Sequence, residues 1–124
     1  MLLYADLTYK LRSAIFNVYN ALGFGHKENV YERALEQELK EIKLPFSKEE
    51  TLDVRYKGIK VGIYRPDFII DGKIIVELKA LEFVPKSSEI QMLHYLKTTG
   101  FKLGFLVNFG YPKLTIKRII WTEK

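Results

Sequence analysis

Two charged side chains, Glu77 and Lys79, interrupt the apolar stretch that runs from residue 74 to residue 80. Because a β-strand directs successive side chains to opposite faces, Glu77 and Lys79 share one face of this strand. The other face carries apolar side chains that we expect to enter the core: Ile74, Val76, Leu78 and Ala80. An acid and a lysine on an apolar strand cost free energy unless they are paired or bind a cation. The chain must therefore fold so that one face of this strand lies in the core and the other at a polar site.

A tight turn precedes this strand and determines what lies beside it. Asp71-Gly72 is typical of a hairpin turn, so the preceding strand folds back and brings Asp67 next to Glu77. Two adjacent carboxylates favour a cation between them, because otherwise one of them stays protonated. Mg²⁺ prefers oxygen ligands of this kind. Two simpler interpretations stay open, since an E-x-K pair is often a solvated face or a local ion pair, and Pro-Asp often marks a turn.

The hydrophobic periodicity predicts an α/β fold. Apolar spacings of three and four, together with start and stop signals, indicate three helices: 6–22, 27–42 and 85–99. Four segments with a β pattern lie between the second and third helices: 51–56, 60–64, 67–70 and 73–81, with turns at 57–58 and 71–72. We expect them to form a meander, which the predicted order of elements counts as three strands. Strands over 102–109 and 114–121 complete the order α-α-β-β-β-α-β-β. A strand after a crossover helix favours a mixed β-sheet flanked by helices.

The composition excludes several kinds of site. With 124 residues the chain has the size of one domain, which we expect to span residues 1–124. It has no cysteine, which excludes disulfides, thiolate zinc sites, iron–sulfur clusters and a cysteine nucleophile. With two histidines, a metal site would consist mostly of carboxylates. The net charge of +5 suits a polyanionic partner.

The distribution of apolar residues gives no sign of a membrane segment. No stretch approaches the ~20 consecutive apolar residues needed to cross a bilayer. Asp6 stands where a signal peptide has its apolar stretch. We therefore expect a soluble, cytoplasmic protein with no membrane partner.

Four ordered motifs resemble those of a known group of enzymes. Pro66-Asp67, followed after nine residues by Glu77-Leu78-Lys79, resembles the PD-(D/E)XK nuclease signature. The segment 25–31 resembles the G-x-x-E-x-x-Y motif of the small GxxExxY proteins, and 91–95 resembles the Q-x-x-x-Y motif of RecB-like nucleases. Asn108-Phe109-Gly110 and Lys117-Arg118-Ile119 are similar to the end of GxxExxY proteins. The resemblance extends from about residue 15 to residue 120.

This resemblance implies a restriction-endonuclease-like core with a divalent cation, Mg²⁺ or Mn²⁺, as cofactor. It assigns catalytic and metal-binding roles to three carboxylates: Glu28, Asp67 and Glu77. The backbone carbonyl of Leu78 is implied as a further ligand. Lys79 is implied to orient or deprotonate the attacking water and to stabilise charge that develops on the phosphate.

The same resemblance places further residues around the site. Gln91 is implied as a catalytic residue and Tyr95 as a contact to nucleic acid, both lining the site from the third helix. His26 is an additional candidate ligand, although the family more often has an apolar residue there.

Each of these residues also has a simpler interpretation. Glu28 would be favourable in the first turn of any helix. Gln91 could complete a capping box opened by Ser88. Tyr31 and Tyr95 fit core-facing tyrosines whose hydroxyls have a partner. His26 fits an ordinary loop residue.

A basic cluster near the C-terminus is a candidate phosphate contact: Lys102, Lys113, Lys117 and Arg118. Alternation along the last strand puts Lys113 and Lys117 on one face and Arg118 on the other. We therefore expect Lys113 and Lys117 to bind nucleic acid, with solvated strand faces as the default alternative.

Together these patterns predict a metal-dependent nuclease that hydrolyses phosphodiester bonds of nucleic acid, DNA in the first place. The alternative is a catalytically silent module that keeps the fold and binds nucleic acid or protein. A small-molecule enzyme is disfavoured, because Gly23-Phe24-Gly25 is followed by Glu28 where a nucleotide-binding loop would receive a phosphate. A domain of this size has little surface for wrapping a duplex, which favours a homodimer.

Overall fold

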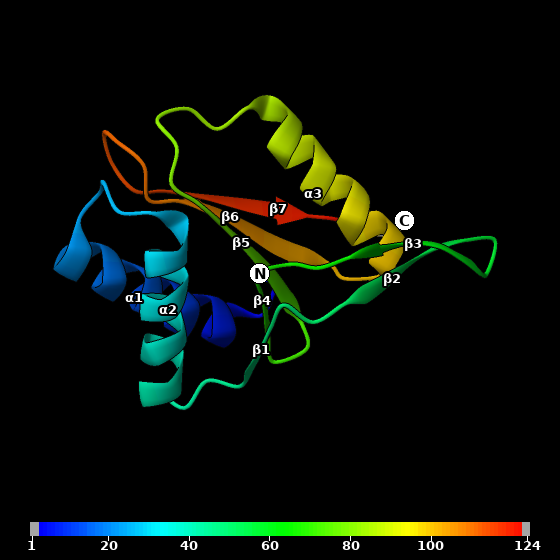
Figure 1. Cartoon of the computed structure of the whole chain (residues 1–124). Helices are drawn as coiled ribbons and strands as arrows, with labels where there is room; N and C mark the ends of the chain where they lie inside the picture. The colour runs from blue at the N-terminus through cyan, green and yellow to red at the C-terminus, as the bar shows by residue number, and fades with distance from the viewer. Residues whose placement is uncertain (1–2, 123–124) are drawn as a thin grey trace.

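The computed structural model describes residues 3–122 and arranges them as a sheet with helices on both faces (Figure 1). The helices of this part of the chain are α1 (Ala5–Leu22), α2 (Glu28–Glu41) and α3 (Lys86–Thr99). Its strands are β1 (Phe46–Lys48), β2 (Leu52–Tyr56), β3 (Ile59–Tyr64), β4 (Phe68–Ile70), β5 (Ile74–Lys79), β6 (Leu103–Asn108) and β7 (Thr115–Ile120).

The main sheet has the strand order β1-β4-β5-β6-β7. Only β5 and β6 pair in parallel within it, and α3 connects them as the crossover, while the other neighbours are antiparallel. The sheet is therefore mixed, as the sequence predicts. Its central strand is β5, the strand that carries Glu77 and Lys79.

Each face of the sheet has its own hydrophobic cluster. On one face, Ile74, Val76 and Leu78 of β5 pack in the cluster to which α1 and α2 contribute. On the other face, Ile75 of β5 packs with Met92 and other residues of α3. Glu77 and Lys79 alternate with Leu78 and so belong to the α3 face, near the end of the strand.

The helices are amphipathic, with one buried and one exposed side. In α2, for example, Tyr31, Leu35 and Leu39 are fully buried at spacings of four, whereas the opposite side faces solvent. Among residues 3–122 no helix is long and apolar enough to cross a membrane.

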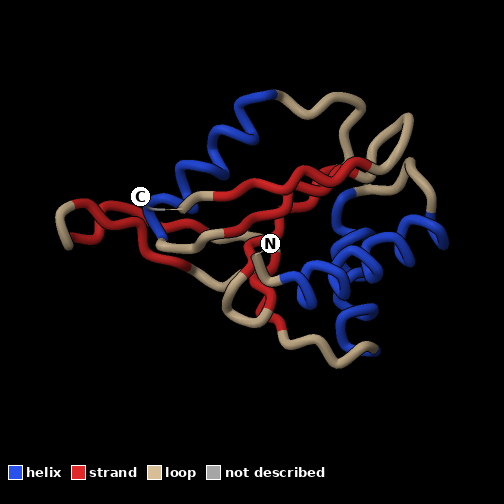
Figure 2. The backbone as a smooth tube through the Cα atoms, turned by 180° about the vertical axis from the view of Figure 1, so that it is seen from behind, coloured by secondary structure: helices blue, strands red, loops and turns tan. Residues whose placement is uncertain are grey.

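Strands β2 and β3 form a separate two-stranded sheet that projects from the body as a hairpin (Figure 2). One of its faces is held against α3, because Leu52, Val54 and Tyr64 pack on the cluster that contains Met92 and Leu96. The rest of the hairpin extends into solvent.

The predicted fold class and the overall order of elements are confirmed, and one detail of the order is wrong. Five strands, not three, lie between α2 and α3. The additional strand β1 has three residues, too few to show a period, and exists because it pairs with β4 in the register Phe46↔Ile70. The segments expected at 60–64 and 67–70 are separate strands in different sheets, β3 and β4, and residues 65–67 lie between them.

Candidate active site

The end of β5 and the segment just before β4 bring Asp67 and Glu77 together. The antiparallel register Phe68↔Val76 places the residue before β4 next to the residue after Val76. The backbone N–H of Asp67 donates to Glu77 Oε1 at 3.1 Å, and the backbone N–H of Leu78 donates to Asp67 Oδ2 at 2.7 Å. The hairpin turn at Asp71-Gly72 thus produces the adjacency that the sequence predicts.

The edge of β5 beyond β4 also exposes a backbone oxygen to this site. In a β-strand the N–H and C=O of one residue point to the same side. The N–H of Leu78 points to the Asp67 carboxylate, so its carbonyl lies on that edge too. This orientation is compatible with the ligand role that the resemblance implies for Leu78.

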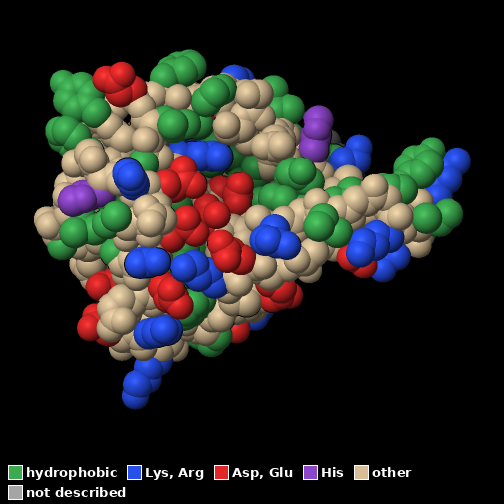
Figure 3. Space-filling model, in the orientation of Figure 1, with side chains coloured by type: hydrophobic (Ala, Val, Ile, Leu, Met, Phe, Trp, Pro, Cys, Tyr) green, Lys and Arg blue, Asp and Glu red, His purple; other side chains and the backbone are tan. Residues whose placement is uncertain are grey.

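Helix α2 contributes two further carboxylates. Glu28 is the first residue of the helix, and Glu32 follows one turn later on the same side. Carboxylate oxygens of Glu28, Glu32 and Asp67 lie within 4.8 Å of one another. We call Glu28, Glu32, Asp67 and Glu77 the acidic centre, and Figure 3 shows acidic side chains gathered in the middle of one face, with lysines and arginines around them.

The carboxylates of the acidic centre are partly removed from solvent and repel one another, and both effects raise pKa values among them. Burial raises the pKa of Glu77 to about 7, and the charge of Asp67 adds to this rise. Burial also raises the pKa of Asp67, against the hydrogen bond from Leu78 that lowers it. The pKa values of Glu28 and Glu32 are raised first by burial and then by the charge of Asp67. The ionised form of each of these four carboxyl groups is disfavoured, and a bound cation would stabilise it.

Lys79 is the cation that the chain itself supplies. Its charge lowers the pKa values of Glu28, Asp67 and Glu77. Among residues 3–122 no ion pair within 4.0 Å joins Lys79 to a carboxylate. Lys79 is partly buried, and its charge acts on the acids without an ion pair to any one of them.

A narrow cavity connects Lys79 and Glu77 with α3. Its volume is about 10 Å³, roughly that of one water molecule. Gln91 and Tyr95 of α3 line it together with Glu77 and Lys79, so the structure assembles both helix residues at the site. Tyr95 stacks on Tyr64 of the hairpin, with ring centroids 3.8 Å apart.

The comparison with protein families identifies this arrangement. A family model described as the PD-(D/E)XK nuclease superfamily matches residues 5–119, a range that contains the whole acidic centre and Lys79. The chain belongs to the PD-(D/E)XK nuclease superfamily. A comparison with curated proteins gives no match.

Two solved structures share the nuclease-like fold. The crystal structure of SSO0001 is 20% identical with a TM-score of 0.56, and the match covers 78% of this chain and 52% of that one. An alkaline exonuclease (LHK-Exo) from Laribacter hongkongensis is 10% identical with a TM-score of 0.55, covering 98% of this chain and 72% of that one. The chain therefore spans about half the length of SSO0001. At such identities the likeness concerns the fold alone.

The structure distinguishes between the simpler interpretations of two nuclease-motif residues. Gln91 does not complete a capping box with Ser88, because α3 begins at Lys86 and its N-cap, Pro85, makes no side-chain hydrogen bond. Glu28 does lie in the first turn of α2, so the helix dipole favours its charge in addition to its place in the acidic centre.

His26 and Tyr31 belong to the G-x-x-E-x-x-Y segment, which leads into α2. Tyr31 is fully buried, donates its hydroxyl to the carbonyl of Gly23 at 2.7 Å and stacks on Phe109. His26 is exposed and its ring packs edge-on against Tyr31. The group of carboxylates within 4.8 Å of one another consists of Glu28, Glu32 and Asp67. It includes Glu32, which the sequence analysis did not name, and it includes neither Glu77 nor the additional candidate His26. Glu32 was missed, although its spacing of four from Glu28 places both on one helix face.

Two residues of the basic C-terminal cluster, Lys113 and Lys117, line the same surface pocket. Lys113 lies in the loop before β7 rather than on the strand, and both lysines line this pocket of about 230 Å³. Lys117 forms an ion pair with Glu89 of α3 at 3.7 Å, so it faces the α3 side. Arg118 alternates to the opposite face. A role of Lys113 and Lys117 in binding nucleic acid stays a prediction.

Proposed function

We propose that this chain is a metal-dependent nuclease that hydrolyses phosphodiester bonds of nucleic acid, with DNA as the preferred substrate. The observation that carries the proposal is the convergence of Glu28, Glu32 and Asp67 carboxylates within 4.8 Å, beside Lys79. Membership of the superfamily supports it.

The donor set fits a divalent cation such as Mg²⁺ or Mn²⁺. Glu28, Glu32 and Asp67 offer three carboxylate oxygens to one position, and Leu78 directs its carbonyl to the same edge. The raised pKa values of these acids indicate repulsion that such an ion would relieve. When bound, the ion neutralises charge on the scissile phosphate and makes the attacking water more acidic.

The remaining site residues act on the water and the phosphate. Lys79 orients the attacking water through its amine and compensates the charge that develops on the phosphate oxygens. Glu77 accepts the N–H of Asp67 and thereby holds the carboxylate of the neighbouring strand in position. Gln91, one turn from Tyr95 on α3, is placed to donate to the same water or phosphate from the wall of the cavity.

Finer assignments follow from the motifs. We place the chain among the GxxExxY proteins and the RecB-like nucleases, supported by the positions of Glu28 and Tyr31 at the start of α2 and of Gln91 and Tyr95 on α3. A homodimer in the cytoplasm remains our expectation, and sedimentation of the purified protein tests its assembly.

Cleavage by matched aspartate variants tests the proposal. Asp67→Asn removes one charge from the acidic centre and keeps an oxygen that can accept the N–H of Leu78. Asp71→Asn removes one charge from an exposed turn, where Asp71 pairs with Lys73. Labelled duplex and single-stranded DNA and RNA are incubated with each protein in Mg²⁺, in Mn²⁺ and in a chelator.

We expect cleavage by the wild type and by Asp71→Asn in either metal, none in the chelator, and none by Asp67→Asn. Equal cleavage by both variants would show that another site, or a contaminant, acts. A wild type that binds nucleic acid but cleaves none of the four substrates would favour the silent binding module.

A further inference from the structure

The β2–β3 hairpin carries much of the positive charge of the chain. We call residues 52–65 the arm. The arm contains one acid, Asp53, and four basic residues: Arg55, Lys57, Lys60 and Arg65. Its net charge of +3 is more than half of the +5 of the whole chain. Figures 2 and 3 show the arm projecting from the body, with basic side chains on the same face of the molecule as the acidic centre.

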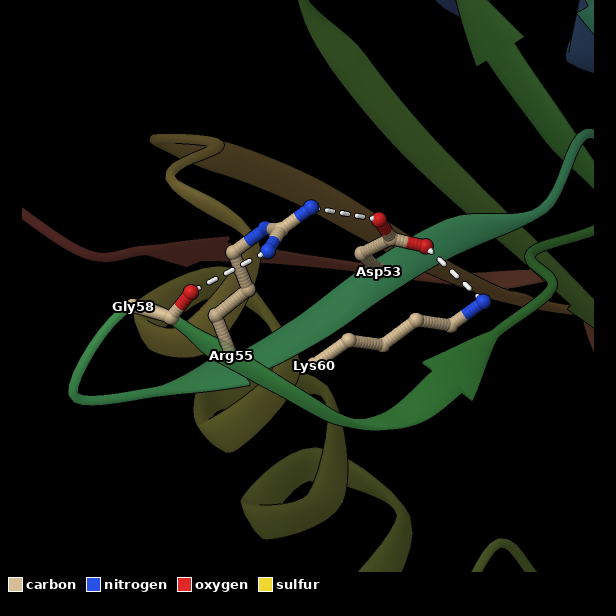
Figure 4. Close-up of polar contacts among 4 residues, drawn as sticks. All are labelled: Asp53, Arg55, Gly58 and Lys60. Atoms are coloured by element: carbon tan, nitrogen blue, oxygen red, sulfur yellow. Dashed lines mark hydrogen bonds and ion pairs between the residues drawn. The ribbon is translucent and has the colours of Figure 1, made fainter.

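Two of the four basic side chains of the arm, Arg55 and Lys60, share one acidic partner. Arg55 donates to Asp53 at 2.8 Å and to the carbonyl of Gly58 at 3.3 Å, and Lys60 pairs with the other oxygen of Asp53 at 3.5 Å (Figure 4). Leu52 and Val54 pack towards α3, so Asp53 and Arg55 alternate to the outward face. One acid therefore holds two cations on a solvent-exposed ribbon.

The arm is joined directly to the active site. Its strand β3 ends at Tyr64, three residues before Asp67. Tyr64 stacks on Tyr95 and lines the cavity that contains Glu77 and Lys79. A contact made along the arm is thus fixed in position relative to the acidic centre.

We propose that the arm binds the phosphate backbone of a double-helical substrate next to the bond that is cleaved. This inference rests on the proposed function and adds the form of the substrate. Duplex DNA carries about one charge per 1.7 Å of its axis, and its major groove, about 12 Å wide, admits a two-stranded β-ribbon. The six residues of β3 span about 20 Å, so a rigid arm can follow a stiff duplex outward from the site.

The surface of the arm favours a duplex over a single strand. Proteins that bind single strands use several exposed aromatic side chains on which successive bases stack. On the arm Tyr56 is exposed, whereas Tyr64 is buried against Tyr95. The backbone charge of a duplex therefore matches the arm better than the bases of a single strand do.

The charge of the arm also disfavours a second copy of the chain as its partner. Exposed Val61 and Ile63 could pack against another hairpin. Such pairing brings two arms of +3 side by side, however, and like charges in close juxtaposition oppose association. A polyanion gains from the same charges.

The experiment compares two pairs of lysines. Lys57→Gln/Lys60→Gln removes two charges from the arm, and Lys57→Arg/Lys60→Arg keeps them. Lys10→Gln/Lys40→Gln is the matched control, because both lysines are exposed on α1 and α2, at the other end of the molecule (Figure 1). Fluorescence anisotropy measures binding to a 20-base-pair duplex and to the corresponding single strand in a chelator over a range of salt. Hydrolysis of bis(p-nitrophenyl) phosphate, which is too small to reach the arm, is measured in Mn²⁺.

We expect Lys57→Gln/Lys60→Gln to lower duplex affinity several-fold and to reduce the slope of log K against log salt by up to about two. The arginine variant and the control should bind as the wild type does, and all four proteins should hydrolyse the small diester equally. A loss confined to the single strand, or affinity for the duplex equal to that of the control, overturns the proposal. The proposal is also overturned if the protein is a dimer, Val61→Thr/Ile63→Thr dissociates it, and this variant binds the duplex as the wild type does.

The two proposals fail separately in this design. Loss of duplex affinity in the arm variant without metal-dependent hydrolysis in the wild type supports the arm and contradicts the nuclease. Metal-dependent hydrolysis by the wild type, together with unchanged duplex affinity in the arm variant, supports the nuclease and contradicts the role of the arm.

Discussion

The acidic centre and the arm differ in how the fold holds their charges. Asp67 and Glu77 lie at the ends of buried strands, and each receives a backbone hydrogen bond that fixes its carboxylate. Arg55 and Lys60 lie on an exposed ribbon and share one surface acid. The acids are held in place against their own repulsion, whereas the cations are solvated and need little support.

This difference predicts how each region responds to change. Desolvated charges interact strongly, so altering one member of the acidic centre should have a large effect on activity or stability. Exposed ion pairs contribute about 0–1 kcal/mol and are screened by salt, so altering the arm should change binding with little effect on the fold.

The largest effect is expected at Lys79. Lys79→Ala removes the amine that acts on the water and the phosphate, so kcat for DNA cleavage should fall by about 10²–10⁴-fold. Cation binding should persist, because the carboxylates remain. Single-turnover cleavage and metal-dependent thermal unfolding measure the two properties separately.

Lys73→Ala is the control for this variant. Lys73 precedes the same strand but is exposed and pairs with Asp71 at 3.1 Å, away from the acidic centre. Cleavage by Lys79→Ala at the rate of Lys73→Ala would contradict the role assigned to the site lysine.

The second prediction concerns cation binding. Mg²⁺ or Mn²⁺ at a hundred times its Kd should raise the free energy of unfolding by about 2.7 kcal/mol, because it binds the folded acidic centre. Glu32→Gln should reduce this gain, whereas Glu41→Gln, at the exposed end of the same helix, should not. Thermal unfolding with metal and with a chelator measures it. If the metal raises the free energy of unfolding equally in both variants, Glu32 is not a ligand. The ligands would then be the carboxylates expected from the sequence: Glu28, Asp67 and Glu77.

The sequence predicts those parts of the site that depend on local geometry. The Asp71-Gly72 turn and strand alternation are sufficient to place Asp67 beside Glu77 and both beside Lys79. Residues that meet through tertiary packing are harder to predict. Glu32 lies near Asp67 because α2 packs on the face of the sheet to which Leu78 points. The periodicity of a helix shows which of its sides is apolar, but not which strand that side packs against.

The fold shows the same limit. Strand β1 is defined by its partner, since three residues carry no period. The alternation of 51–56 and 60–64 identifies a hairpin but does not show that it leaves the main sheet and packs on α3. The projection of the arm results from tertiary packing, which the local pattern of residues 52–65 does not specify.

The third prediction concerns pH in the absence of metal. The folded state keeps a proton on Glu77 up to about pH 7, whereas the unfolded chain loses it near 4.5. Between these values the folded state binds more protons, so stability should fall as pH rises, by roughly 2 kcal/mol after allowance for partial exposure. Urea unfolding in a chelator from pH 4.5 to 8 measures it. Glu77→Gln, which has no proton to lose, should flatten the profile, and an equally steep profile in that variant would assign the effect to other groups.

The smallest effect is expected where the arm meets the body. Val54→Ala removes two methyl groups that pack on α3, whereas Val61→Ala removes the same atoms from a side chain of the same hairpin that is 60% exposed. The first change should weaken the docking of the arm by about 1 kcal/mol and the second by much less. Hydrogen exchange should then accelerate for residues 52–64 in Val54→Ala and leave β4 and β5 protected, since local opening of a projecting hairpin does not require the sheet to open. Duplex affinity should fall with it, because a loosened arm no longer holds its charges in position relative to Tyr64 and the cavity. If exchange in β4 and β5 accelerates as much as in the arm, the two regions unfold as one unit, and the contrast between a supported acidic centre and an independent arm is wrong.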